Sequence, residues 1–394
     1  MKNVASHRNI ALYKWFVLFA EPLFWGPIVI QSIMVLGKME LSQIYFMEAI
    51  VTILIILLNI PTGALADIIG RKKTLIIGQA FLLGSFIGFA TMNSPWQAWF
   101  ANILWAIGYA FQTGSDHALI YQTLKSQGQE KSFTELEGKA CGRRLLLIAV
   151  CCLAVGPLAK IDLRLPLYLC LPFVFIPFVI SFFFKEERVV SGYSTKKQLE
   201  VLKQGVMFVF RKPEVLWVIG FVTLIGGASK IWFFTYNPYF EGVGVDLKYY
   251  GVVFFFLNLV AWFFSHYASR VEEHLSERRC VIGMILCIGL PILLMGIFPF
   301  WFMVSLVLVQ NIVRGFMRPF TSNFMNRHID SEDIRATALS TKSTFSDMFT
   351  ALALSWFGVM NTNLGLFPSM TVLGIIVLAL GFISYLQYRR LFKK

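Results

Sequence analysis

Long apolar stretches alternate with short polar stretches along the whole chain. A helix needs about 20 predominantly apolar residues to cross the hydrocarbon core of a bilayer. A window of that length finds twelve candidate spans, at about 10–37, 41–62, 74–93, 96–117, 139–160, 165–184, 215–240, 247–268, 279–297, 300–324, 337–360 and 364–388. The pattern therefore predicts an all-α membrane protein with twelve transmembrane helices.

A polar, charged stretch at 185–213 separates the candidate spans into two groups of six. We expect an N-terminal six-helix bundle at 1–184, a cytoplasmic linker at 185–213 and a C-terminal six-helix bundle at 214–394. Within the linker, Lys196 to Phe210 predicts an amphipathic segment that lies along the membrane surface.

The two halves resemble each other at an offset of about 205 residues. Pro61 to Gly78, which closes the second predicted span and opens the third, is echoed by Ser265 to Gly283 at the eighth and ninth. Two pseudo-symmetric bundles of six helices are typical of a duplicated transporter. This organisation excludes a seven-helix receptor.

Of the 394 residues, 57% are hydrophobic and 14% charged, and the net charge is +13. The Lys and Arg residues are distributed unequally between the loops on the two sides of the predicted membrane. Loops after even-numbered spans and the tail carry basic clusters, such as Arg71, Lys72, Lys73, Arg389 and Arg390, whereas loops after odd-numbered spans carry few basic residues. The positive-inside rule then places both termini in the cytoplasm, in a bacterial inner membrane. The charge reflects this bias and not binding to nucleic acid.

No catalytic, metal or cofactor site is evident. The six cysteines lie almost all in apolar runs and the five histidines are scattered, without metal-site spacing. A phosphate-binding glycine loop is also absent, so ATP has no visible binding site. We expect a monomeric secondary transporter and not an enzyme, with a small-molecule substrate and protons as the coupling ion.

The loop between the second and third predicted spans, Gly63 to Leu75, reads GALADIIGRKKTL. It resembles the signature loop of the major facilitator superfamily, G-x-L-A-D-x-x-G-R-K-x-x-L, at every defined position. The resemblance implies the twelve-helix fold of that family, transport by alternating access, and a gating role for the loop on the cytoplasmic side. A basic anchor without a gating role is the alternative.

The chemistry of this loop supports a gating role. Gly63 and Gly70 permit a tight turn and a close helix approach. Asp67 can cap the N-terminus of a facing helix and pair with Arg71 or another basic residue. Lys72 continues the basic cluster.

The copy of the loop in the second half departs from the pattern. It carries Arg270, Glu272 and Glu273 where the aspartate would stand, and Ser276 in place of the second glycine. An asymmetric latch is the expectation.

Two further segments resemble those of bacterial exporters in the superfamily. Gly156-Pro157 resembles the start of the antiporter motif in the fifth span, although the glycines that should follow are replaced by Ala159 and Lys160. Arg335 to Ser340 resembles an R-A-T-x-L-S segment. Each also has a structural interpretation, Pro157 as a helix-end proline and Arg335 to Ser340 as the start of a helix.

Ionisable residues at membrane depth are costly and indicate function. Glu21 falls in the middle of the first predicted span, with Lys14 seven residues earlier on the same expected helical face. Lys230 falls in the middle of the seventh. We predict that Glu21 and Lys230 form an ion pair in one state of the transport cycle and that Glu21 carries the proton. A permanent structural salt bridge is the alternative.

Two other charged groups are candidates for the proton or substrate path. Asp347 in the eleventh predicted span and Arg314 in the tenth lie toward the cytoplasmic half and could pair with each other. Asp116 and His117 end the fourth span near the basic residues Lys139, Arg143 and Arg144. A charge relay and a solvated helix end are both open interpretations there.

These features favour proton-coupled efflux of a small amphipathic molecule, such as a drug, metabolite or siderophore. A proton-coupled importer of a nutrient or siderophore is the alternative. Hydropathy also leaves open a lysolipid translocator.

Overall fold

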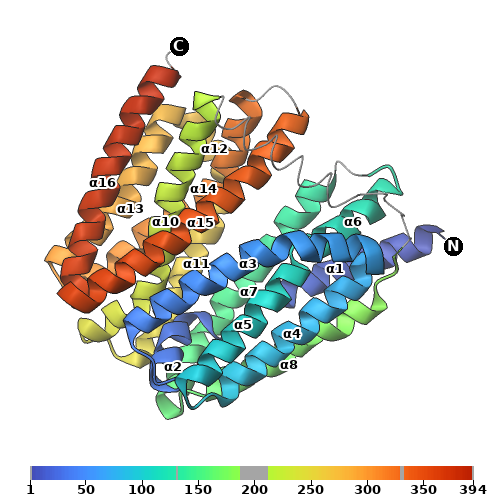
Figure 1. The fold of residues 1–394 in the computed structure, drawn as a ribbon, viewed down its shortest axis with the longest axis horizontal. Coiled ribbons are helices and arrows are strands. Elements are labelled where there is room, and N and C mark those ends of the chain that lie inside the picture. Colours follow the sequence, from blue (N-terminus) through green and yellow to red (C-terminus); the bar gives the residue numbers. More distant parts are fainter. Residues whose placement is uncertain (1, 130–131, 187–211, 329–331, 393–394) are drawn as a thin grey trace. The chain divides into compact units, whose positions relative to one another are not determined.

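The computed structural model describes residues 2–129, 132–186, 212–328 and 332–392, drawn as ribbons in Figure 1. These residues form fifteen α-helices and three short 3-10 helices. Eight helices in the described parts are long and apolar enough to cross a membrane. The count of twelve spans stays a prediction, and the predicted amphipathic segment from Lys196 to Phe210 lies outside the described residues.

The chain divides into two compact units. Unit 1 comprises Met1–Met39, Val51–Tyr193 and Leu247–Phe255, and unit 2 comprises Glu40–Ile50, Ser194–Asp246 and Phe256–Lys394. Each half of the sequence thus contributes one short segment to the unit formed mainly by the other half. The bundle boundaries expected from the sequence stay a prediction.

Unit 1 is built mainly from the first eight helices. They are α1 (Lys2–Phe19), α2 (Val29–Val35), most of α3 (Leu41–Ile69), α4 (Arg71–Thr91), α5 (Pro95–Gln112), α6 (Ser115–Lys125), α7 (Phe133–Ile161) and α8 (Leu165–Phe183). Helix α4 packs along α5 and α8. A Cβ on Gly108 would lie 2.8 Å from the carbonyl oxygen of Gly78. Small residues therefore let the backbones of α4 and α5 approach closely, as is common between membrane helices.

The first predicted span is a broken helix. Helix α1 ends at Phe19, residues 20–25 are not helical, and a 3-10 turn at Gly26–Ile28 leads into α2. Pro22 and Pro27 explain the break, because a proline removes a backbone donor and disfavours helical geometry in the residue before it. The expectation that Lys14 and Glu21 share one helical face was therefore wrong, since Glu21 lies in the break.

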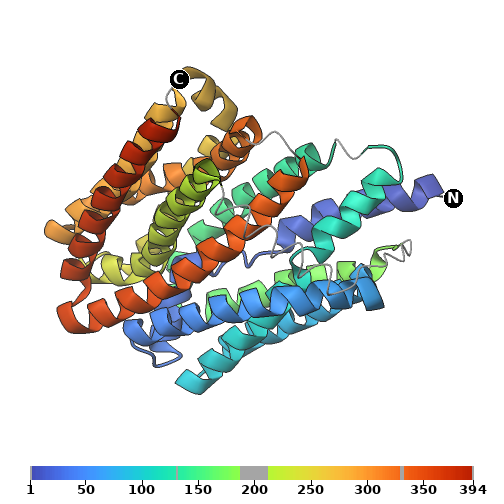
Figure 2. The same cartoon turned by 45° about the horizontal axis from the view of Figure 1, so that its top comes forward.

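Unit 2 is built mainly from the last seven helices. They are α10 (Pro213–Gly242), most of α11 (Tyr250–His266), α12 (Ala268–His274), α13 (Glu277–Ile297), α14 (Leu306–His328), α15 (Glu332–Leu364) and α16 (Leu366–Leu391). Helix α10 packs against α15 and α16, and α13 against α16 (Figure 2). A Cβ on Gly374 of α16 would lie 2.6 Å from the Leu293 backbone of α13, so this contact also depends on glycine.

The two crossing segments are held by close contacts. In unit 2, the Tyr45 hydroxyl at the start of α3 lies 2.6 Å from the Thr235 hydroxyl of α10. In unit 1, a Cβ on Gly156 of α7 would lie 2.1 Å from the Lys248 carbonyl oxygen, and one on Gly251 of α11 would lie 2.1 Å from that of Cys152. Backbone therefore touches backbone at both glycines. This packing supplies a structural reason for the glycine of the Gly156-Pro157 dipeptide.

Candidate transport site and gating loops

Glu21 lies in the break of the first span and faces a cation from α7. Its Oε1 atom lies 3.0 Å from Nη2 of Arg144, and the side chains are 52% and 20% exposed, respectively. Irregular backbone at membrane depth is tolerated where it is buried in protein or lines a water-filled cavity. Broken helices carry the binding sites of many transporters. The half-exposed carboxylate in this break is therefore the first candidate for a proton or substrate site.

The sequence did not predict Arg144 as the partner of Glu21. It was named only in the basic run near Asp116 and His117, although it falls inside the predicted span 139–160, where a charge is itself a functional signal. Lys230, the predicted partner of Glu21, lies on α10 in unit 2. A Glu21–Lys230 pair would join the two units, and it stays a prediction.

Arg314 is the centre of a polar network within unit 2. Its guanidinium donates to Oδ1 of Asn311 at 3.2 Å and to Oδ1 of Asn258 on α11 at 3.1 Å. Asn311 in turn donates to the Tyr236 hydroxyl of α10 at 3.0 Å. The two asparagines and the tyrosine are buried. Arg314 is thus held by amides, and its predicted partner Asp347 lies exposed on α15.

The signature loop is closed by a residue far away in the sequence. Glu186, just after α8, accepts hydrogen bonds from the backbone N–H groups of Arg71 at 2.7 Å and Lys72 at 3.0 Å. These are the first residues of α4, so the carboxylate caps the helix and faces the positive end of its dipole. Gly70 has a φ of +96°, which permits the turn before the helix.

The other predicted gating residues have a different environment. The Arg71 guanidinium donates to the carbonyl oxygen of Ala118 on α6 at 2.9 Å, and so ties the loop to that helix. A Cβ on Gly63 would meet no heavy atom of the described residues within 4 Å apart from its chain neighbours and the nearby backbone of its own helix. Asp67 is half-buried at the end of α3. Gating by these residues stays a prediction.

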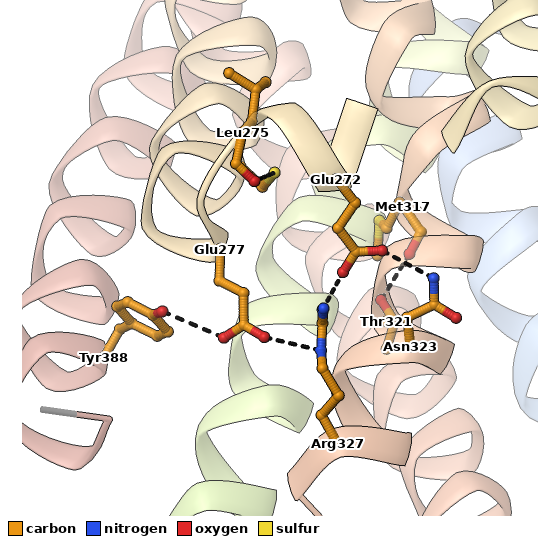
Figure 3. A network of polar contacts seen from close by, with 9 residues as sticks. Glu272, Leu275, Glu277, Met317, Thr321, Asn323, Arg327 and Tyr388 are labelled. Atoms are coloured by element: carbon orange, nitrogen blue, oxygen red, sulfur yellow. Dashed lines mark hydrogen bonds and ion pairs between the residues drawn. The ribbon is translucent and has the colours of Figure 1, made fainter. Parts of the chain in front are cut away.

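The corresponding loop of the second half is closed by an arginine (Figure 3). The Arg327 guanidinium on α14 pairs with Glu272 of α12 and, through Nε, with Glu277 of α13 at 2.9 Å. Asn323 donates to the second oxygen of Glu272 at 2.8 Å, and the Tyr388 hydroxyl of α16 donates to Glu277 at 3.4 Å. Four helices of unit 2 meet in this network.

The loops of the two halves therefore use different chemistry. A carboxylate on backbone amides closes the first, and an arginine between two carboxylates closes the second. The predicted Glu272 takes part, whereas Glu186, Glu277 and Arg327 were not among the candidates. No sequence signal separates Glu186 from the charged linker that follows it.

Comparison with known proteins identifies the family. Residues 27–347, most of the chain, match the Major Facilitator Superfamily. The chain belongs to the major facilitator superfamily. Members of this superfamily are secondary membrane transporters, which fits the expectation that the chain is not an enzyme.

Individual relatives are distant. An uncharacterized MFS-type transporter of Bacillus subtilis (strain 168), YxaM, is 22% identical over 249 residues, which are 60% of this chain and 60% of the relative. The fold is similar to that of the nucleoside transporter NupG, with a TM-score of 0.75, 14% identity and coverage of 99% of each chain. A D-xylose-proton symporter gives a TM-score of 0.72 at 11% identity, with 97% of each chain covered. At these identities the structures support the fold of the superfamily alone.

Proposed function

We propose that the protein is a proton-coupled secondary transporter in which Glu21 carries the proton and Arg144 is its counter-charge. The observation that supports this proposal is their 3.0 Å contact at the break of the first span. A carboxylate beside an arginine has two states. In one it is ionised and paired with the arginine, and in the other it is protonated and no longer attracts the arginine. The exposed fraction of Glu21, 52%, gives protons access to it.

The cycle follows from charge balance. When Glu21 is ionised, Arg144 is held at the break of the first span. When Glu21 takes up a proton, the attraction is lost and the Arg144 guanidinium, 20% exposed and with an Nε atom that already has no partner among the described residues, keeps its charge without a counter-ion. Burying an unpaired charge is costly, so the helices must rearrange or a substrate must supply a partner. Proton binding thereby shifts the equilibrium between the inward-open and outward-open states.

For the direction of transport, the segments that resemble those of exporters favour efflux of a small amphipathic molecule. Uptake by symport is a second candidate, and two observations favour it. The amides and guanidinium of Asn258, Asn311 and Arg314 suit a polar solute with hydrogen-bonding groups. In addition, one protein with a similar fold is named a D-xylose-proton symporter.

The other predicted site residues lie in unit 2 and in the signature loop. We infer that Lys230 and Asp347, on the neighbouring helices α10 and α15, act on the same path in unit 2. The signature loop, with Gly63, Asp67, Gly70, Arg71 and Lys72, would form the gate on the cytoplasmic side. Both termini would lie in the cytoplasm of a bacterial inner membrane.

Everted membrane vesicles test this function. An inside-acid pH gradient is set across the vesicle membrane, and its collapse is followed on adding a panel of amphipathic compounds, nucleosides and sugars. Uptake by symport is measured in parallel in cells or right-side-out vesicles. We expect one compound to move protons in wild type and not in Glu21→Gln or Arg144→Gln. Glu40→Gln, an exposed acid before α3, serves as the control and should behave as wild type. A proton flux that survives in Glu21→Gln would contradict the proposal.

A further inference from the structure

A second charged cluster lies in unit 1, where α6 and α7 begin. The His117 ring has a carboxylate opposite each nitrogen, with Nε2 3.2 Å from Glu137 and Nδ1 3.7 Å from Asp116. The two carboxylate side chains are 17% and 11% exposed and that of His117 is 45% exposed. Both ring nitrogens carry hydrogen only when histidine is protonated, so this arrangement favours the cation.

The cluster and the Glu21–Arg144 pair share one face of α7. Glu137, Cys141 and Arg144 follow at intervals of four and three residues, which places them on the same side of the helix. Arg144 Nη2, which pairs with Glu21, also lies 4.0 Å from the Cys141 sulfur, one turn closer to Glu137. Helical side chains incline toward the N-terminus of their helix. Glu137 is therefore the next acid on this face of α7 in the direction in which the Arg144 guanidinium points.

A buried hydroxyl on α1 interacts electrostatically with residues of both the Glu21–Arg144 pair and the His117 cluster. The side chain of Tyr13 on α1 is 1% exposed, and its Oη atom has no hydrogen-bond partner among the described residues. Asp116, Glu137 and Arg144 are the charged side chains that interact electrostatically with this hydroxyl. This polar atom lies within the apolar core that α1, α6 and α7 build together.

The groups around His117 come from four helices. Asp116 from α6 and Glu137 from α7 contact His117 itself, Arg71 from α4 donates to the carbonyl of the next residue, and Tyr13 from α1 and Arg144 from α7 interact electrostatically with the same two carboxylates or with each other. The Phe133 ring closes one side, 6.1 Å from the imidazole centre. The signature loop therefore reaches this cluster through Arg71.

We propose that His117 and Glu137 form a second proton site, on the side predicted to face the cytoplasm, and that Arg144 couples it to Glu21. This inference rests on the proposed function and extends it. Protonation of Glu21 releases Arg144 toward Glu137. The guanidinium then competes with the imidazolium for the Glu137 carboxylate, and His117 loses its proton to the cytoplasmic side. Protonation of His117 occupies Glu137 and holds Arg144 at Glu21.

The proton balance of this exchange is one for one. One proton binds the Glu21 carboxylate and one leaves a His117 nitrogen, while Arg144 keeps its charge throughout. The two sites are thus negatively coupled, and by linkage each disfavours protonation of the other to the same extent. Such coupling lets arrival of a proton at the substrate site drive release of another at the far end.

Histidine NMR of the full-length protein in nanodiscs tests the coupling without any substrate. The chain has five histidines, and His117→Gln assigns the signal. We expect Glu21→Gln to lower the titration midpoint of His117 by about one pH unit, because a freed Arg144 weakens the favourable charge of Glu137. In an Arg144→Gln background, Glu21→Gln should have no such effect.

Glu135→Gln is the matched control, because this acid lies two residues from Glu137, is 67% exposed and pairs with Lys139. It should leave the His117 midpoint within about 0.2 units, since exposed charges are screened. An unchanged midpoint in Glu21→Gln, an equal shift in Glu135→Gln, or a His117 that does not titrate would overturn the coupling. The vesicle assay decides separately whether transport is proton-driven, so the failure of one proposal is distinguishable from that of the other.

Discussion

The Glu186 carboxylate accepts the backbone N–H of Arg71 at 2.7 Å, across 115 residues of sequence. This contact fixes the end of α8 to the start of α4 at the signature loop. The second half has no copy of it among the described residues and uses the Arg327 network instead. The two loops should therefore respond differently to removal of a carboxylate or of an arginine.

Glu186→Ala should destabilise the protein by about 1–2 kcal/mol, the usual cost of losing a helix cap. Two backbone donors lose their acceptor, and the α4 dipole loses a negative charge. Thermal melting in detergent would show a midpoint lowered by a few degrees. Glu241→Ala, at the exposed end of α10, is the control and should melt as wild type does. If both variants had the same melting temperature, Glu186 would not act as the cap of α4.

Arg327→Gln should destabilise unit 2, because it leaves Glu272 without its cation at 6% exposure. The arginine itself is 46% exposed, which reduces the expected cost to about 1–2 kcal/mol. The double variant Glu272→Gln/Arg327→Gln should recover part of the loss, since Glu272, the most buried carboxylate of the network, is then neutral. A double-mutant cycle by thermal melting measures this interaction. Strictly additive effects would show that the two side chains are not coupled.

Gly156→Ala should destabilise the protein, because its Cβ would lie 2.1 Å from the Lys248 carbonyl oxygen and backbone cannot yield easily. Gly138→Ala on the same helix would meet no atom of the described residues within 4 Å apart from its chain neighbours and the nearby backbone of α7. It should be neutral or stabilising by up to about 1 kcal/mol. Melting temperature and yield of folded protein report both changes. Similar behaviour of the two alanine variants would mean that α7 does not approach the Lys248 backbone as closely as described.

Apolar periodicity and one thirteen-residue loop were enough to predict a helical membrane protein of the right superfamily. Both features are local in sequence. The break in the first span was also signalled, by Pro22 and Pro27, but the length of the apolar run suggested a continuous helix. A helix interrupted over six residues retains the hydropathy of an unbroken one, so composition alone does not reveal it.

The partners of the charged residues were harder to predict. Glu21 was predicted as a candidate from its place in the first span, but its contact with Arg144 depends on how the first span packs against α7, across 123 positions of sequence. The Glu186 cap and the Arg327 network also join segments that only tertiary packing brings together. A single sequence shows which charges are buried in a span and does not show which of them face one another.

The most direct test of the account compares two modes of transport in proteoliposomes, with the compound that the vesicle panel identifies. One mode is net transport driven by a pH gradient, and the other is exchange of labelled for unlabelled compound at equal pH. If Glu21 carries the proton, Glu21→Gln should abolish the net, gradient-driven mode and retain exchange, because exchange requires no change of protonation. Gradient-driven transport that persists in Glu21→Gln would contradict the central claim.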